Sequence, residues 1–347
     1  MKSRCKAISL LIGIFLIFSL IGCTNSNDDS KPLSKTEYFM GTVVTVTLYD
    51  NKSEKIIDKA FEEVKKIEQL VSINMEGTEL DEVNNNAGIK PVKVSDDTYN
   101  IIKKGLEYSS LTNGSFDITI GPLVKLWSIG LPEAKVPTIE EIKEKIQYIN
   151  YNDVELNNSE KTVFLKKPGM IIDLGGIAKG YTADVIAQTL KDEGVEKAII
   201  DLGGNIYALG EKAENTLWRI GIQNPDQTRG EIVGSINVKD KSIVTSGIYE
   251  RFIEQDGVKY HHILSPKSGY PYDNEIAGVT IISDKSIDGD ALSTSVFSMG
   301  ITKGLEFINS LPDTEAIFIT KDHKIYLTEG SKEIFKLTND DFQIINY

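Results

Sequence analysis

The sequence predicts an α+β fold whose second half is dominated by strands. After an apolar N-terminal segment, the 347-residue chain continues with a strand-like alternation and then a helical repeat of apolar residues. Beyond Gly194 most apolar segments are short and strand-like, and they are interrupted by helices near residues 290–310. Because strands and helices do not alternate regularly along the chain, a mixed α+β domain is favoured over a parallel α/β fold.

The first folded elements are predicted to be a strand and an amphipathic helix. Residues 43–48 (VVTVTL) alternate as in a half-buried strand, and apolar residues within 56–70 then recur at helical spacing. A second helix is expected around residues 99–108, with the Asn-Gly pair at 113–114 stopping it. The Thr and Glu at the ends of segment 138–141 (TIEE) form a capping box, which predicts the start of a third helix.

Short apolar segments after Gly194 are the strand candidates of the second half. They are residues 198–201, 218–222, 232–238, 260–264, 279–282, 316–320 and 324–327. The pentapeptide Ile-Asp-Leu-Gly-Gly occurs twice, at 172–176 and at 200–204, each time after an apolar segment. This short repeat is compatible with a duplicated structural unit.

The N-terminus predicts export and lipid attachment. Three basic residues precede an apolar segment at 7–21, which is the layout of a signal peptide spanning residues 1–22. The segment ends in Leu-Ile-Gly before Cys23, which looks like the lipobox of bacterial lipoproteins; the alternative is a signal anchor with an incidental cysteine. Residues 23–35 then read as a lipidated polar tether, and residues 36–347 as the folded domain. We therefore expect a cell-membrane protein anchored on the extracytoplasmic face.

Composition excludes several classes of function. The formal net charge of -13 becomes -13 - 3 = -16 once the three basic residues of the signal peptide are removed, which argues against a nucleic-acid partner. The two cysteines are Cys5, which leaves with the signal peptide, and Cys23, which is lipidated. The mature domain therefore has no disulfide and no cysteine-based metal site.

A glycine-rich segment at 170–184 (MIIDLGGIAKGYTAD) is the first candidate site. It leads from an apolar strand into a helical pattern, with Asp173 before the two glycines and Lys179 after them. Glycine backbone and a helix N-terminus favour an anion, and the lysine adds positive charge. A purely structural strand-to-helix turn remains open on this segment alone, because it has neither Walker nor Rossmann spacing.

Asp290 and Thr294 form the second candidate site. Their spacing of four places a carboxylate and a hydroxyl on one helical face. Oxygen ligands without cysteine suit Mg²⁺ better than zinc. The alternative is that Asp290 caps the helix and Thr294 bonds back to a carbonyl.

Two of the three histidines are adjacent, in segment 259–271 (KYHHILSPKSGYP). If the strand alternates, His261 and His262 face opposite ways, so only one of them faces a pocket. Histidine suits proton transfer near neutral pH, although a structural role is common. His323, in a Lys-Asp-His-Lys turn, is expected to be a solvated loop residue.

Taken together, these segments resemble the ApbE family, the bacterial FAD:protein FMN transferases. The resemblance is an ordered series along most of the mature chain rather than one motif. The matching segments are 39–42 (FMGT), 113–123 (NGSFDITIGPL), 173–180, 244–247 (VTSG), 262–271 and 290–294. It implies a largely antiparallel α+β architecture with two lobes around a flavin cleft.

The resemblance also implies an activity and a set of site residues. The enzyme would bind FAD as substrate, cleave its pyrophosphate with Mg²⁺, move FMN onto a Thr hydroxyl of an extracytoplasmic acceptor and release AMP. Mg²⁺ would be held by Asp290, Thr294 and the carbonyl of Gly176, and His262 would be the base. FAD contacts would come from Met40, Asn74, Asp117, Ile118, Thr119, Asp173, Lys179, Ser246 and Leu264, several through backbone atoms. The expected acceptors are flavin-accepting subunits or domains of membrane redox proteins, reached from the lipid anchor at Cys23.

Three departures from the family pattern keep alternatives open. Asn74 stands where many members have an aromatic residue, which removes a stacking platform. Asp81 and Glu82 replace a Ser and a basic residue, and Ser265 replaces a frequent Asp after His262. A Mg²⁺-dependent FAD pyrophosphatase and a non-catalytic flavin-binding lipoprotein are therefore the alternative functions.

Overall fold

The computed structural model describes residues 31–346. From Leu33 onward the chain forms one compact unit. The predicted signal peptide, the lipidation site at Cys23 and most of the predicted tether lie outside the described residues. The end of the tether was misplaced, because residues 33–35 already belong to the first strand, β1 (Leu33–Phe39), which pairs with β2 (Thr42–Leu48) along its whole length. Within residues 31–346, no helix is long and apolar enough to cross a membrane.

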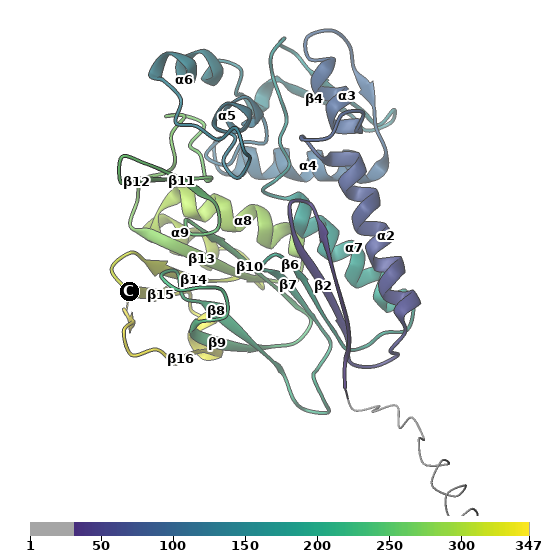
Figure 1. Cartoon of the computed structure of the whole chain (residues 1–347), viewed down its shortest axis with the longest axis vertical. Coiled ribbons are helices and arrows are strands. Elements are labelled where there is room, and N and C mark those ends of the chain that lie inside the picture. Colours follow the sequence, from purple (N-terminus) through teal and green to yellow (C-terminus); the bar gives the residue numbers. More distant parts are fainter. Residues whose placement is uncertain (1–30, 347) are drawn as a thin grey trace, which may run out of the picture. The chain divides into compact units, whose positions relative to one another are not determined.

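A long mixed sheet is the centre of the fold (Figure 1). Within residues 31–346 it has nine strands in the order β1-β2-β6-β7-β10-β13-β14-β15-β17. Its neighbours pair antiparallel except β15 and β17, which are parallel. Besides β1 and β2, the strands are β6 (Ala198–Leu202), β7 (Asn205–Leu209), β10 (Lys241–Gly247), β13 (Ile276–Ser283), β14 (Glu315–Thr320), β15 (Lys324–Leu327) and β17 (Gln343–Ile344).

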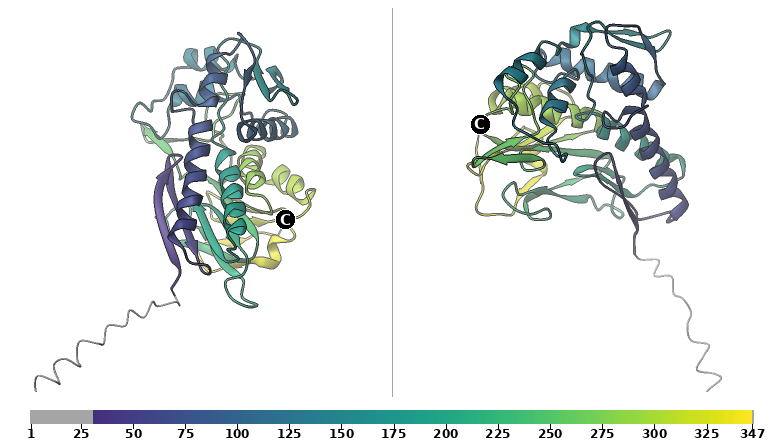
Figure 2. Two further views of the ribbon diagram at one scale, coloured as in Figure 1. Left: turned by 90° about the vertical axis from the view of Figure 1, so that its right-hand side faces the viewer. Right: turned by 45° about the horizontal axis from the view of Figure 1, so that its top comes forward.

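Helices cover one face of this sheet. They are α2 (Glu54–Val71), α7 (Ala178–Asp192), α8 (Ser286–Met299) and α9 (Ile301–Asn309). In Figures 1 and 2, α2 (purple) and α7 (teal) run side by side. Val64 of α2 and Ile186 of α7 belong to one buried cluster with Val46 and Ile200 of the sheet. This apolar burial is the main stabilising contribution that holds α7, and hence the glycine segment before it, in place.

A small sheet covers another part of the central sheet. It has the order β16-β9-β8, formed by β8 (Trp218–Gln223), β9 (Ile232–Val238) and β16 (Phe335–Leu337), and α10 (Ser331–Ile334) precedes β16. Ile220 and Ile236 of this small sheet pack with Ile243 of β10 and Ile317 of β14. The central sheet is therefore covered on both faces where these residues meet, and β13 is buried at all eight positions rather than at alternate ones.

Shorter elements form the helical part at the top of Figure 1. They are α3 (Glu79–Asn85), α4 (Asp96–Leu111), α5 (Gly121–Trp127), α6 (Ile139–Ile146), η1 (Tyr151–Asp153) and a sheet of β3 (Val92–Lys93), β5 (Thr162–Leu165) and β4 (Val154–Asn157). A separate hairpin of β11 (Phe252–Gln255) and β12 (Val258–His261) lies beside them. Trp127 of α5 contacts Tyr260 of β12, ring to ring, at 5.6 Å between centroids.

The predicted α+β class with largely antiparallel sheets is confirmed. So is the capping box, in which the side chain of Thr138 accepts from Glu141 N–H and Glu141 accepts from Thr138 N–H. The predicted strand at 260–264 is confirmed only for residues 260–261, because β12 ends at His261 and Leu264 forms only an isolated bridge with Pro271. The chain turns there through Ser265, whose carbonyl accepts a hydrogen bond from Gly269 N–H at 2.8 Å.

Candidate active site

The glycine segment forms a turn held by one hydrogen bond to a neighbouring loop and one within the turn. Ile171 makes a single parallel bridge with Ile120, so the strand predicted before the turn is reduced to one bridge. Asp173 N–H donates to Ile118 O at 2.8 Å, and Asp173 Oδ1 accepts from Gly175 N–H at 2.6 Å. Burial raises the pKa of Asp173, while the Gly175 N–H and nearby cationic side chains lower it. Two predicted FAD contacts, Ile118 and Asp173, are thus adjacent in space.

Asp290 does not cap its own helix, α8, in which it is the fifth residue. The N-terminus of α8 is capped by Asp184 of α7, whose carboxylate accepts from Ser286 N–H at 2.9 Å and from Ile287 N–H at 3.0 Å. The capping alternative for Asp290 was therefore wrong. Asp290 is only 4% exposed. Its carboxylate accepts from Gly180 N–H at 2.9 Å and from Lys179 Nζ at 3.2 Å.

Hydroxyl groups lie close to this carboxylate in sequence and in space. Thr294, one turn after Asp290, has its Oγ1 at 3.4 Å from Ser246 Oγ. Ser246 Oγ also lies 2.8 Å from Ser293 Oγ. A Cβ placed on Gly176 would come 3.7 Å from Thr294 Oγ1, so Gly176 lies beside this hydroxyl. The structure therefore brings the predicted metal-binding residues and Ser246 together.

The oxygen donors at this place fit a hard divalent cation. A carboxylate, a hydroxyl and a main-chain carbonyl are the ligand types that Mg²⁺ accepts, and substrate phosphate commonly completes its shell. Within residues 31–346, no group of three His, Cys, Asp or Glu side chains is arranged to hold a metal ion. A cation held here would thus depend on Asp290 as its main negative ligand, and Lys179 is the positive charge that now pairs with it.

The two adjacent histidines have different surroundings, as the alternation predicts. His261 is buried; its Nε2 lies 2.9 Å from Tyr272 O and its ring packs edge-on against Phe297. His262 N–H donates to Arg251 O at 3.1 Å, and His262 Nδ1 lies 3.2 Å from the same oxygen. A carbonyl only accepts, so Nδ1 must carry the proton and Nε2 keeps a free lone pair.

His262 is neutral at physiological pH. Burial lowers its pKa to about 4, and the positive charges of Arg251 and Lys179 act in the same direction. The contact with Arg251 O opposes this shift but does not outweigh it. A neutral imidazole with an open Nε2 is the form that accepts a proton from an attacking hydroxyl.

The turn between β1 and β2 is held in a left-handed conformation. Met40 has φ 52° and Gly41 has φ 69°. Met40 N–H donates to Glu68 Oε1 at 2.6 Å, and Gly41 O accepts from Arg251 Nη2 at 3.0 Å. Met40, a predicted FAD contact, is thereby linked through Arg251 to the His262 hairpin.

The loop at 117–119 is rigid and largely buried. Asp117 Oδ1 accepts from the N–H and the hydroxyl of Thr119, at 2.8 and 2.7 Å, and Asp117 Oδ2 accepts from Tyr151 N–H at 3.1 Å. Burial raises the pKa of Asp117, and these hydrogen bonds oppose the shift. The side chains of Ile118, Thr119 and Leu264 are buried, so a ligand contact by these predicted residues would use main-chain atoms.

The residues that depart from the family pattern have local structural roles. Asn74 is exposed in the loop after α2, where its N–H donates to Ser72 Oγ at 3.3 Å. Asp81 Oδ2 accepts from Gly77 N–H at the start of α3. Ser265 Oγ accepts from the N–H groups of residues 267 and 268, so it shapes the turn after His262.

His323 is more ordered than its sequence suggested. It lies in the turn between β14 and β15, where its Nε2 is 2.7 Å from Asp226 Oδ2 and its ring stacks on Phe342 at 4.6 Å. The expectation of a simply solvated residue was therefore incomplete. The pairing involves residues far apart in sequence, which local pattern does not reveal.

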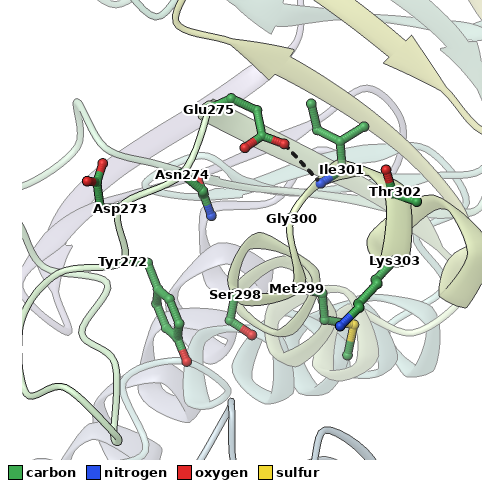
Figure 3. A pocket seen from close by; sticks show the side chains of 10 residues that line it. All are labelled: Tyr272, Asp273, Asn274, Glu275, Ser298, Met299, Gly300, Ile301, Thr302 and Lys303. Atoms are coloured by element: carbon green, nitrogen blue, oxygen red, sulfur yellow. Dashed lines mark hydrogen bonds between the residues drawn. The ribbon is translucent and has the colours of Figure 1, made fainter.

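A surface hollow of about 390 Å³ lies at the junction of α8 and α9 (Figure 3). It is lined by residues 272–275 and 298–303, none of which is a predicted site residue. The carboxylate of Glu275 points toward Ile301 N–H, at 3.5 Å, and so covers the N-terminus of α9 (Figure 3). This hollow is not part of the site described above.

Sequence reasoning missed Arg251. No motif spacing marks it, and the contacts that make it notable join residues 210 positions apart. One signal was present in the composition: the chain has arginine only at positions 4, 219, 229 and 251. An arginine next to the histidine segment of so acidic a chain was a reason to consider it.

The candidate site combines a neutral imidazole, a buried carboxylate, neighbouring hydroxyl groups and a lysine, which are side chains suited to an enzyme with a phosphate-containing substrate. The chain belongs to the ApbE family, whose model matches residues 40–318. An FAD:protein FMN transferase of Klebsiella pneumoniae (strain 342) is 38% identical over 318 residues, covering 92% of this chain and 98% of the relative. One of Treponema pallidum (strain Nichols) is 34% identical over 348 residues, covering 95% and 96%.

Solved structures agree with this membership. The ApbE protein from Thermotoga maritima superposes with a TM-score of 0.80 at 32% identity, covering 88% of this chain and 99% of that one. The flavin transferase ApbE from Vibrio cholerae gives 0.79 at 28% identity, with the same coverage of 88% and 99%. The resemblance inferred from the ordered segments is confirmed.

Proposed function

We propose that this chain transfers FMN from FAD to a Thr hydroxyl of an acceptor protein, with Mg²⁺ and with release of AMP. FMN transfer from FAD to protein is the activity named for relatives that match nearly the whole chain. The observation that carries the proposal is the placement of His262, neutral and with a free Nε2, in a fold that also gathers Asp290, Thr294 and Gly176.

The reaction requires positioning and charge neutralisation more than covalent chemistry by the protein. The acceptor oxygen forms a bond to the FMN phosphorus, and the bond from that phosphorus to the AMP oxygen breaks with its electron pair leaving on AMP. His262 Nε2 takes the hydroxyl proton. Asp290, Thr294 and the carbonyl of Gly176 would hold Mg²⁺, which when bound supplies neutralisation of the diphosphate charge. Lys179 adds a second positive charge beside Asp290.

The main-chain groups around this centre would orient FAD. The Asp117–Thr119 loop and the Asp173 turn are joined by the Asp173 N–H to Ile118 O bond. Their buried side chains and internal hydrogen bonds fix the backbone before substrate arrives, which lowers the entropy cost of binding.

Mass spectrometry of an acceptor tests the proposal. Protein, FAD and Mg²⁺ are incubated with a purified flavin-accepting domain of a membrane redox protein, and an added FMN mass on Thr is expected. Asp290→Asn should abolish the adduct, whereas Asp226→Asn, which alters a surface pair with His323, should not. Failure to modify any of several such domains would refute the transfer activity.

The extracytoplasmic, lipid-anchored location is part of the proposal. It is supported by the basic start, the apolar segment and the Gly-Cys pair that ends at Cys23. Cys23→Ala should release the protein from the membrane fraction and reduce modification of anchored acceptors in cells. Equal modification by the released form would show that anchoring is not needed.

A Mg²⁺-dependent FAD pyrophosphatase is the second candidate, favoured by the exposed Asn74 at the place of a common aromatic residue. Water would then replace the acceptor hydroxyl. Release of FMN and AMP without an acceptor supports this activity, and intact FAD after long incubation excludes it. The remaining alternative, a binding protein without turnover, is disfavoured because relatives matching 92% and 95% of the chain are named as transferases.

A further inference from the structure

Arg251 joins two parts of the site that are distant in sequence. Its main-chain oxygen accepts from His262 N–H at 3.1 Å and lies 3.2 Å from His262 Nδ1. Its side chain reaches the other way, where Nη2 donates to Gly41 O at 3.0 Å. One residue therefore sets the ring of the general base through its backbone and contacts the Met40–Gly41 turn through its guanidinium.

Glycines on both sides leave room for this side chain. A Cβ on Gly41 would lie 3.4 Å from Arg251 Nη2, and a Cβ on Gly130 would lie 3.3 Å from Arg251 Cδ. Gly41 and Gly130 have φ of 69° and 93°, a region that side-chain-bearing residues rarely adopt. The arginine stem thus passes between the main chain of the β1–β2 turn and that of the loop after α5.

The hairpin next to His262 lies outside the central sheet and is held there by side-chain contacts, including those of His261 with Tyr272 O and Phe297. Within residues 31–346, β11 and β12 pair with each other and with no strand of the central sheet. Ile253 and Tyr260, the second cross-strand pair from the base of the hairpin, pack into a small apolar cluster with Trp127. At the base of the hairpin, the Arg251 side chain links the hairpin to the β1–β2 turn through its hydrogen bond to Gly41 O.

We propose that Arg251 is a positioning residue for the transfer reaction: its guanidinium fastens the His262 hairpin to the Met40–Gly41 turn and so fixes the base relative to bound FAD. This inference rests on the proposed function. Because the hydrogen bonds to His262 use the main chain, replacing the side chain leaves them possible but frees the hairpin to shift. A misplacement of about 1 Å can cost on the order of 100-fold in rate.

Arg251→Gln and Arg251→Lys test this role, with Arg219→Gln as the matched control. Arg219 also makes a single side-chain hydrogen bond, from Nε to Ser235 Oγ at 3.0 Å, but on β8 and β9. We expect kcat for FMN transfer to fall roughly 10- to 100-fold in Arg251→Gln, with KM for FAD changed less than about 3-fold. Arg251→Lys should recover part of the loss because it keeps the charge and a donor, and Arg219→Gln should match wild type.

Two readouts do not need turnover. Hydrogen exchange of the amides in residues 252–263 should be faster in Arg251→Gln and unchanged in Arg219→Gln. The His262 ring, followed by NMR, should titrate at a higher pKa in Arg251→Gln, since the charges that face it are those of Arg251, Lys179 and His261 and one of them is removed. The chain has three histidines, so a His262→Gln spectrum assigns the signal.

The results separate this inference from the proposed function. If wild type modifies no acceptor, the proposed transfer fails, while exchange and titration still report on Arg251. A variant with wild-type kcat and unchanged exchange would overturn the positioning role. A raised KM for FAD at constant kcat would also overturn it, because Arg251 would then act as a substrate-binding group.

Discussion

The pH dependence of FAD turnover follows from the environment of His262. Burial and neighbouring positive charge hold its pKa at about 4, so the neutral base persists well below neutral pH. At about pH 5.5 such a group is about 97% neutral, whereas a histidine with the ordinary pKa of about 6.5 is only about 9% neutral. Between about pH 7.5 and 5.5, kcat/KM for FAD should therefore fall by less than about 1.5-fold rather than by about 10-fold.

The assay is an initial-rate measurement of FMN transfer at subsaturating FAD, with Mg²⁺ and acceptor held constant. Circular dichroism at each pH establishes that the fold is intact. The profile of kcat/KM reports groups in the free enzyme, which is the state described here. A tenfold loss of kcat/KM centred near pH 6.5, with an unchanged circular dichroism spectrum, would refute the conclusion that His262 is held neutral by its surroundings.

The same shift has a consequence for stability. The folded His262 binds a proton less readily than the unfolded chain, so the unfolded state carries more protons between about pH 6.5 and 4. Its contribution to the free energy of unfolding is therefore complete above about pH 6.5 and is lost as the pH falls toward 4. His262→Gln should flatten the pH dependence of unfolding in that interval, as measured by urea denaturation.

Three further predictions concern Asp290, Lys179 and Gly203. Asp290→Asn should lower transfer on the order of 100-fold or more in a kinetic assay, because it removes the buried charge on which a cation would depend. Lys179→Gln should tighten Mg²⁺ binding in calorimetry, because it removes the ammonium at 3.2 Å from Asp290, yet weaken FAD binding. Gly203→Ala should lower the free energy of unfolding, measured in urea, by about 2–4 kcal/mol, because its Cβ would meet Thr42 Oγ1 at 2.0 Å and its φ is 65°. Gly257→Ala, where φ is 76° and the Cβ would meet no atom within 4 Å, should lower the free energy of unfolding by only about 1 kcal/mol.

The location of several site residues was predictable from sequence, but their roles were less so. The turn at 173–176 and the helix after it follow from local pattern, yet the sequence left an anion-binding turn and a structural turn equally open. The structure shows that Asp173 N–H bonds to Ile118 O and that Lys179 pairs with Asp290. Both contacts join segments far apart in the chain, so no local pattern contains them.

Strands in the middle of the central sheet were the elements hardest to predict. β7 and β10 were missed, and β10 is buried at four of its seven positions, with partial exposure at Lys241, Thr245 and Ser246. Such a strand gives no two-residue alternation, because both of its faces are covered. Its identity depends on pairing with β7 and β13, which is a tertiary property.

The sequence by itself determined the fold class, the capped start of α6 at Thr138, and the ordered segments that place the chain in its family. These are encoded in residues a few positions apart, because periodicity and capping are short-range effects. The tertiary structure decided that Asp184 rather than Asp290 caps α8, that the His262 ring contacts Arg251 O through Nδ1 rather than Nε2, and that the Arg251 side chain bonds to Gly41 O. Each of those outcomes depends on which distant group fills a hydrogen-bonding position, and only the folded chain selects among the candidates.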